Sequence, residues 1–299
     1  MAAPPATLRA LLSEAIDYAG LFPPASLSML ETVRRYATYR RAPEAWALGR
    51  LVVPASRLEE LHEVLQSERV ADPPWPLSIL LGADVDADVA GSLDITPRSM
   101  GIRVDSFEGA AADADEVGRL ADRVREVADH FAAPLYVELP LSIDIRGAIL
   151  SLRRARVRAK ARTGGVTASA IPPASQVLRF LEGCIGADFS FKVTAGLHHA
   201  VRGEHPLTYE PGGACGTMHG FLNVFAAAAL LTAGVAAEDV APVLDETEAS
   251  AFRFHDELLE WHGRRAGIDA VRLARRRLDA FGSCSFEEPI AELRALGLV

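Results

Sequence analysis

The feature that most limits the fold of this chain is a regular alternation of short apolar runs with helix-like segments. Eight runs have the length and composition of strands, at residues 14–21, 49–54, 77–82, 100–107, 135–139, 157–163, 189–194 and 278–282. Strands that alternate with helices form a parallel sheet of β-α units, and eight such units close into a barrel. We therefore predict an α/β protein with a (β/α)8 TIM-barrel fold, in a single domain over residues 1–299.

The helix-like segments have a 3.6-residue period that is clearest at residues 56–66, 115–131 and 175–183. Ser56, followed by Glu59 three residues later, predicts a capping box at the start of the first of these helices. The stretch 200–271 is too long for one loop and one helix. It predicts a helical insertion after the seventh strand, with extra helices or a small hairpin near residues 252–261. The nearly apolar run 221–237 falls short of a membrane span and predicts a buried helix.

Composition and charge limit the partners. Hydrophobic residues make up 49% of the 299 residues and charged residues 24%, which is typical of a globular protein. The net charge of −9 opposes binding to nucleic acid and to anionic membranes, so we expect a small-molecule substrate; a homo-oligomer is compatible with the sequence.

The three cysteines have no C-x-x-C spacing and predict neither a disulfide framework nor a cysteine zinc site. Because the N-terminus also lacks the layout of a secretory signal, we expect a cytoplasmic protein.

Only two of the 31 basic residues are lysine, Lys160 and Lys192. Codon bias in a GC-rich genome explains an excess of arginine, which replaces lysine wherever only a charge or a long stem is needed. Arginine stays protonated and cannot act as an amine nucleophile, whereas a desolvated lysine can. The two remaining lysines are therefore candidates for chemistry. Each lies near the end of a strand-like run and is followed four residues later by glycine, Gly164 and Gly196.

The two lysines are predicted at the carboxyl ends of successive strands, where active sites of such barrels lie. Adjacent strands are about 4.8 Å apart, so two ammonium groups at similar depth repel each other and one tends to lose its proton. A neutral amine attacks a carbonyl carbon and forms an imine. We predict this Schiff base at Lys160, with Lys192 as the neighbouring charge. The alternative is a lysine that pairs with Glu138 or Asp105 and serves only structure or ligand charge.

The residues around the lysines resemble the deoxyribose-phosphate aldolase family, class I aldolases on a (β/α)8 barrel. The family's sixth strand carries its Schiff-base lysine in a K-x-x-T-G motif, and residues 160–164 read K-A-R-T-G. Its seventh strand carries a second lysine before a glycine pair, and residues 192–196 read K-V-T-A-G. The resemblance implies a lyase that forms an imine with a small carbonyl substrate and makes or breaks a carbon–carbon bond, with no metal and no organic cofactor.

Shorter matches follow in chain order. Residues 16–17 (I-D) resemble the family's first strand, 51–54 (L-V-V-P) its second, 136–138 (Y-V-E) its fifth, and 281–285 (F-G-S-C-S) its F-G-x-S-S phosphate loop. Residues 103–105 (R-V-D) resemble its E-V-D, which implies that Asp105 belongs to a catalytic proton relay. The predicted substrate-binding residues are Asp17, Glu138, Arg162, Thr163, Gly196, His198, His199, Gly282, Ser283 and Ser285. At least one of the acidic residues Asp17 and Glu138 is expected to pair with a lysine.

The chain departs from the family at two places. Residues 195–199 read A-G-L-H-H where the family has G-G-x-R, so His198 and His199 are expected to hydrogen-bond in the pocket or the insertion. Arg162 stands where the family usually has serine and adds a cation that can hold a carboxylate. The substrate is therefore left open between a phosphorylated carbonyl compound and a carboxylated one such as an oxo acid.

Three alternatives stay open at this point. Gly282, Ser283 and Ser285 form either an anion site at a helix N-terminus or only a tight turn, with Cys284 as a small buried hydrophobe. His198, His199 and His219 could instead bind a divalent metal together with Glu138, as in a metal-dependent hydrolase or isomerase. The barrel could also be catalytically inactive and bind a small anion.

Overall fold

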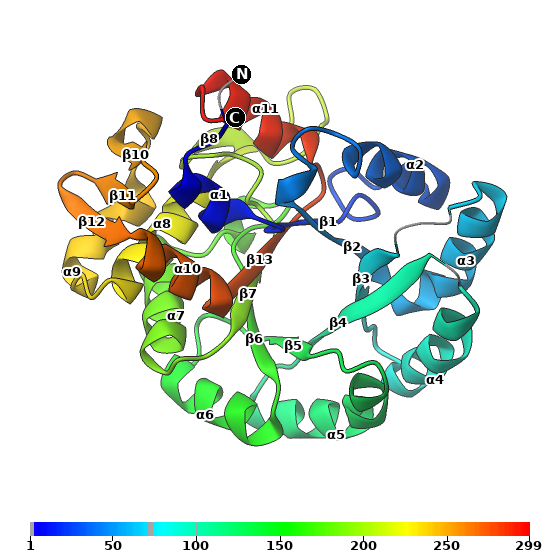
Figure 1. Ribbon diagram of the computed structural model, residues 1–299. Coiled ribbons are helices and arrows are strands. Elements are labelled where there is room, and N and C mark those ends of the chain that lie inside the picture. The colour runs from blue at the N-terminus through cyan, green and yellow to red at the C-terminus, as the bar shows by residue number, and fades with distance from the viewer. Residues whose placement is uncertain (1–2, 71–73, 100) are drawn as a thin grey trace.

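The computed structural model describes residues 3–70, 74–99 and 101–299. Eight parallel strands form a closed barrel in the order β1-β13-β7-β6-β5-β4-β3-β2 (Figure 1), which confirms the (β/α)8 fold. The strands are β1 (Ile16–Tyr18), β2 (Leu48–Pro54), β3 (Trp75–Leu80), β4 (Ile102–Ala110), β5 (Leu135–Glu138), β6 (Arg158–Arg162), β7 (Phe191–Thr194) and β13 (Leu278–Ser283). Each predicted run overlaps one of them, and residue 100 of the fourth run lies outside the described residues.

Helices surround the strands and follow one another around the barrel (Figure 1). They are α1 (Ala6–Leu12), α2 (Met29–Tyr39), α3 (Leu58–Ser67), α4 (Val85–Ile95), α5 (Ala114–His130), α6 (Ile145–Ala155), α7 (Ala174–Gly186), α8 (Phe221–Thr232), α10 (Ile268–Arg277) and α11 (Glu287–Ala295). The three clearest predicted helices are α3, α5 and α7. The predicted capping box is wrong: Ser56 lies inside a 3-10 turn, Ala55–Arg57, so α3 begins only after Arg57 and has no side-chain cap.

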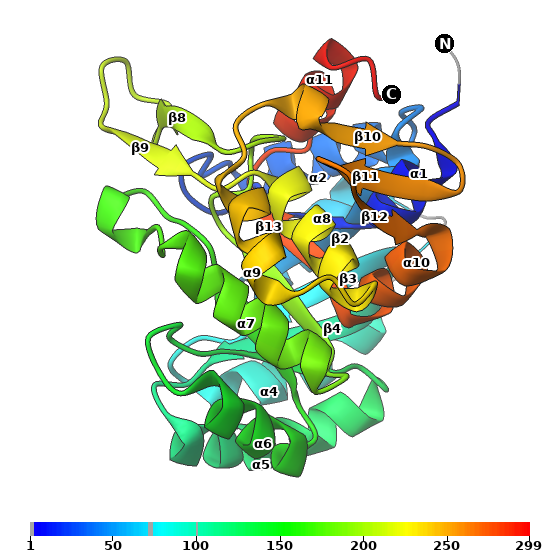
Figure 2. The same ribbon diagram turned by 90° about the vertical axis from the view of Figure 1, so that its left-hand side faces the viewer.

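The insertion holds strands as well as helices. β8 (Gly203–Pro206) and β9 (Cys215–Met218) form a hairpin that projects beside the barrel (Figure 2). After α8 and the short helix α9 (Ala237–Val240), a three-stranded antiparallel sheet follows: β10 (Phe252–Phe254), β11 (Leu258–Trp261) and β12 (Arg264–Gly267). The hairpin expected near residues 252–261 is therefore β10–β11. Among the described residues, no helix combines the length and the apolar character needed to cross a bilayer.

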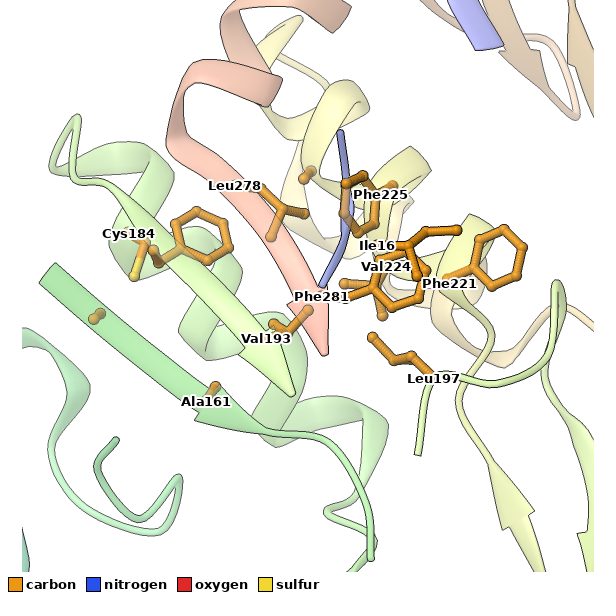
Figure 3. Close-up of a cluster of buried hydrophobic side chains, with 14 of the residues drawn as sticks. Ile16, Ala161, Cys184, Val193, Leu197, Phe221, Val224, Phe225, Leu278 and Phe281 are labelled. Carbon is orange, nitrogen blue, oxygen red and sulfur yellow. The ribbon is translucent and has the colours of Figure 1, made fainter. Parts of the chain in front are cut away.

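The apolar core beside β7 and β13 determines which side chains point into the barrel. Phe281 of β13 lies between Phe221 and Phe225 of α8 (Figure 3), with ring centroids 5.3 and 5.6 Å away. Because side chains alternate along a strand, the outward position of Val193 and Ala161 directs Lys192 and Lys160 inward. Burial of the apolar residues against the helices thus places the charged residues inside the barrel.

Candidate active site

The two lysines meet inside the barrel at one carboxylate. Lys160 and Lys192 are paired across β6 and β7, and their side chains are buried, 5% and 1% exposed. Glu108 of β4 lies between them. Its Oε1 is 2.5 Å from Lys192 Nζ and its Oε2 is 2.8 Å from Lys160 Nζ. The amines therefore converge, but each donates to the same anion and their mutual repulsion is offset.

Each lysine has a second carboxylate partner besides Glu108. Asp17 accepts from Lys192 at 2.6 Å, and the Glu138 carboxylate lies 3.1 Å from Lys160 and 2.9 Å from Arg162. The expectation that an acidic residue pairs with a lysine is confirmed for both Asp17 and Glu138. Cations and anions thus alternate from Asp17 to Arg162, so each buried charge has an opposite neighbour, as burial of ionised groups requires.

This arrangement fixes the charge of Lys192 and Glu108. Burial alone lowers the pKa of Lys192, but the carboxylates of Asp17 and Glu108 raise it to a net value above that of free lysine. Burial raises the pKa of Glu108, but the two ammonium groups lower it to a net value well below that of free glutamate. Lys192 is therefore a permanent cation and Glu108 a permanent anion near neutral pH. Lys160 shares the carboxylate of Glu138 with Arg162.

Gly164 and Gly196, each four residues after a lysine, lie where two loops approach so closely that a side chain does not fit. A Cβ on Gly164 would lie 2.8 Å from the Cα of Gly196, and a Cβ on Gly196 would lie 2.8 Å from the Cα of Gly164. The loops after β6 and β7 therefore touch backbone to backbone. Thr163 joins them further, because its hydroxyl donates to the carbonyl oxygen of Ala195 at 2.7 Å. The T-G and A-G pairs hold the ends of the two lysine strands together.

Gly196→Ala is expected to reduce the free energy of unfolding by about 1–3 kcal/mol, because Ala must adopt φ of +75° and its Cβ displaces Gly164. Denaturant unfolding measures the loss. Gly118→Ala is the matched control: Gly118 lies inside α5 with open space around it, so the same change is expected to be neutral or slightly stabilising. Equal effects of the two substitutions would contradict the close approach of the loops.

A cavity of about 810 Å³ opens above the lysines. Lys160, Lys192, Glu108 and Arg162 line its charged part. Most of the remaining wall is apolar, with Phe22, Pro23 and Pro24 from the loop after β1 and Leu207 and Tyr209 from the hairpin between β8 and β9. The carboxyl ends of the strands therefore provide a charged base, and the insertion provides part of the apolar wall, as is usual for small-molecule sites.

A second polar cluster lines the cavity at the ends of β7 and β13. The Nδ1 atom of His198 is 3.3 Å from Glu288 Oε2 and 3.3 Å from the Ser283 hydroxyl. Cys284 Sγ is 3.8 Å from the same nitrogen, and the Tyr209 hydroxyl is 3.6 Å from that sulfur. Burial lowers the pKa of His198, but Cys284 and Glu288 raise it to a net value of about 9. His198 is therefore an imidazolium near neutral pH.

The charge of His198 predicts a pH-dependent contribution to stability. Its pKa is about 9 in the folded protein, against 6.5 for an unperturbed histidine, so its contribution of about 3 kcal/mol is fully present below pH 6.5 and is lost as the pH rises through 9. Urea unfolding of wild type and His198→Asn at pH 6 and pH 10 measures it. We expect the difference between the two proteins to shrink by that amount at pH 10; a constant difference would show that folding does not shift the pKa of His198.

Of the two alternatives for residues 282–285, an anion site or only a tight turn, the contacts favour the turn. The Ser283 hydroxyl donates to the carbonyl oxygen of Ser285, and the Ser285 hydroxyl accepts from the backbone N–H of Glu288. The first turn of α11 carries Glu287 and Glu288, whose carboxylates already complement the positive helix end. Gly282 lies against Thr194, where a Cβ would be 2.7 Å from its hydroxyl. A tight turn therefore describes residues 282–285 better than a phosphate loop does.

Asp105 does not lie with the lysines. The register between β3 and β4 passes from Leu77↔Val104 to Ser78↔Ser106, so Asp105 is the extra residue of a β-bulge. Its carboxylate pairs instead with Arg103 at 2.6 Å. Glu108, not Asp105, is the acidic residue of β4 that lies with the two lysines. The sequence reasoning missed Glu108 because it ended the fourth strand at residue 107, whereas β4 continues to Ala110.

The residues of the metal alternative have separate partners. His199 pairs with Glu292 and stacks on His205, His219 contacts Arg202 and the Pro172 carbonyl oxygen, and His198 pairs with Glu288. Glu138 is held by Lys160 and Arg162. Among residues 3–70, 74–99 and 101–299, no three His, Cys, Asp or Glu side chains are grouped to hold an ion. Glu138 and the three histidines therefore do not share one ligand set.

No protein-family model and no curated protein matches this chain. Its chemistry therefore follows from the site alone. The site combines two buried lysines that share a carboxylate, a largely apolar cavity above them and a charged histidine at the cavity wall. Such a site offers an amine nucleophile, carboxylates within hydrogen-bond distance that take its proton, and an apolar surface for the rest of a small molecule.

Proposed function

We propose that the protein is a lyase of the class I aldolase kind, which forms an imine between Lys160 and a small carbonyl substrate. The observation that carries the proposal is the pair of buried lysines that share Glu108 at the base of a cavity at the carboxyl ends of the strands. The resemblance of residues 160–164 and 192–196 to the lysine motifs of the deoxyribose-phosphate aldolase family supports it.

The contacts of Lys160 suit each step of this chemistry. Glu138, whose carboxylate is 3.1 Å from Nζ, is close enough to take its proton. The neutral amine then attacks the carbonyl carbon, and the carbonyl oxygen takes up two protons and leaves as water. Breaking the bond between the next two carbons leaves its electron pair on the carbon beside the imine, as an enamine. Protonation of that carbon and hydrolysis by water release the product and restore the amine.

Lys192 has a different role in the proposal. Asp17 and Glu108 hold it as a cation deep in the barrel, so it does not attack a carbonyl. Its fixed positive charge lies beside Lys160 at the carboxylate that both lysines share, Glu108. The lack of a formed phosphate loop at residues 282–285, together with the apolar wall, favours substrates without a phosphate group.

Trapping with sodium cyanoborohydride tests the proposal, because this reagent reduces an imine to a stable amine. Wild-type protein is treated separately with acetaldehyde, acetone, pyruvate and glyoxylate, and the mass gain is mapped by peptide mass spectrometry. The chain has two lysine amines and its α-amino group, so each assignment is unambiguous. We expect the adduct at Lys160. Labelling of the α-amino group alone, or of Lys192 in place of Lys160, would refute the proposal.

A further inference from the structure

An aldol reaction has a second oxygen whose proton must be handled. When the carbon–carbon bond breaks, the hydroxyl on the far carbon loses its proton and becomes a carbonyl; in the reverse direction that oxygen gains a proton. Glu108 and Glu138 are engaged with the amines at the base of the cavity. The second oxygen of a substrate joined to Lys160 is on the second carbon from the imine carbon, so its acid–base group must belong to the wall of the same cavity.

The His198 side chain lies on that wall. It belongs to the loop after β7 and faces residues that follow β13, while Lys160 is on β6, so the strand order β13-β7-β6 brings both groups to one end of the barrel. Both line the same cavity. His198 is 7% exposed and faces Glu288 from α11, Ser283 and Cys284 at the end of β13, and, through Cys284, Tyr209 of the hairpin.

The contacts of His198 are those of a proton-transfer group. Glu288 fixes the ring through Nδ1 and balances its positive charge, as a carboxylate does for a catalytic imidazole. The remaining nitrogen, Nε2, is 4.0 Å from Cys284 Sγ, which is a weak acceptor, so it stays available to a substrate. The imine chemistry of Lys160 does not use the His198–Glu288 pair, although both residues line the same cavity.

We propose that His198 is the acid–base group for the hydroxyl oxygen of a β-hydroxy carbonyl substrate, and that Glu288 positions it. This inference rests on the proposed function. Cleavage uses the fraction of His198 that is deprotonated: the neutral imidazole takes the hydroxyl proton, the O–H electrons form the new carbonyl, and the carbon–carbon electrons pass to the imine to give the enamine at Lys160. In synthesis, the imidazolium returns that proton to the oxygen as the bond forms. No oxidant or reductant takes part.

The test uses 4-hydroxy-4-phenylbutan-2-one, an uncharged β-hydroxy ketone, with cyanoborohydride trapping. The mass of the adduct at Lys160 reports whether the carbon–carbon bond has broken: the reduced acetone imine marks cleavage and release of benzaldehyde, and the full-length adduct marks imine formation alone. We expect the cleaved adduct in wild type. In His198→Asn we expect the full-length adduct, with the ratio of cleaved to full-length product lower by about a hundredfold or more.

The controls separate the two hypotheses. Exchange of acetone protons in D2O needs the imine and proton transfer at carbon but none at a hydroxyl oxygen, so detectable exchange in His198→Asn shows that the variant folds and forms the imine. Glu288→Gln is expected to move the acidic limb of the cleavage pH profile, which is set by deprotonation of His198, to lower pH. Equal cleavage in wild type and His198→Asn overturns the role of His198 alone. A full-length adduct in both proteins overturns the carbon–carbon cleavage, and the role of His198 with it, but not imine formation at Lys160. No adduct at Lys160 in either protein overturns the proposed function and this inference with it.

Discussion

Lys160→Arg is expected to abolish imine trapping and to lower the rate of carbon–carbon cleavage by about a thousandfold or more, since removal of a catalytic nucleophile has effects of at least this size. The guanidinium keeps a positive charge near Glu108 and Glu138, but it stays protonated and has no free amine. The fold is therefore expected to persist. Cyanoborohydride trapping with acetone and the cleavage rate of 4-hydroxy-4-phenylbutan-2-one measure the two effects.

Lys192→Arg is the matched control, because it makes the same change at the neighbouring buried lysine. It removes an amine that is held as a cation by Asp17 and Glu108, so the adduct at Lys160 is expected to remain even if a larger side chain slows the reaction. An adduct that persists at residue 192 in Lys160→Arg would assign the nucleophile to the other lysine. Cleavage at the wild-type rate in Lys160→Arg with no adduct at residue 192 would exclude imine catalysis by either lysine.

The fold was predictable from sequence because its signal is repeated. Each barrel strand must bury apolar residues against the helices, so eight separate runs carry the same pattern, and an error of two residues in one run leaves the count unchanged. The lysines were predictable for a different reason. In a chain where arginine serves every other basic position, the two lysines stand out as the only amine side chains.

The residues between the lysines were harder to predict. Glu108 was missed because a β-bulge at Asp105 shifts the alternation of β4, and a period-two pattern cannot be followed through an extra residue. The pairing of His198 with Glu288 joins positions 90 residues apart and follows from the meeting of two loops at the barrel end. No local pattern encodes such a contact. Sequence reasoning therefore located the proposed nucleophile but missed Glu108, one of the two carboxylates beside it.

Glu108→Gln is expected to lower the free energy of unfolding at pH 7 by about 3–5 kcal/mol, the usual cost of removing one partner of a buried ion pair. Glutamine has nearly the same shape but no charge, so two buried ammonium groups lose the anion that separates them. Because the pKa of Glu108 is lowered by the lysines, its contribution is present above the pKa of the unfolded chain and is lost as the pH falls. Urea unfolding at pH 7 measures the change.

The double variant Glu108→Gln, Lys192→Met tests whether the loss of stability comes from the contact between Glu108 and Lys192. Removal of Lys192 eliminates one of the two unbalanced charges, so part of the loss is expected to be recovered, and the two substitutions are expected to be strongly non-additive because their side chains touch. Asp86→Asn, which breaks the exposed pair with Arg123, is the control and is expected to have little effect. A loss below about 1 kcal/mol in Glu108→Gln, as for a surface ion pair, would mean that the lysines do not depend on the charge of Glu108. The arrangement that leaves Lys160 as the reactive amine would then be wrong.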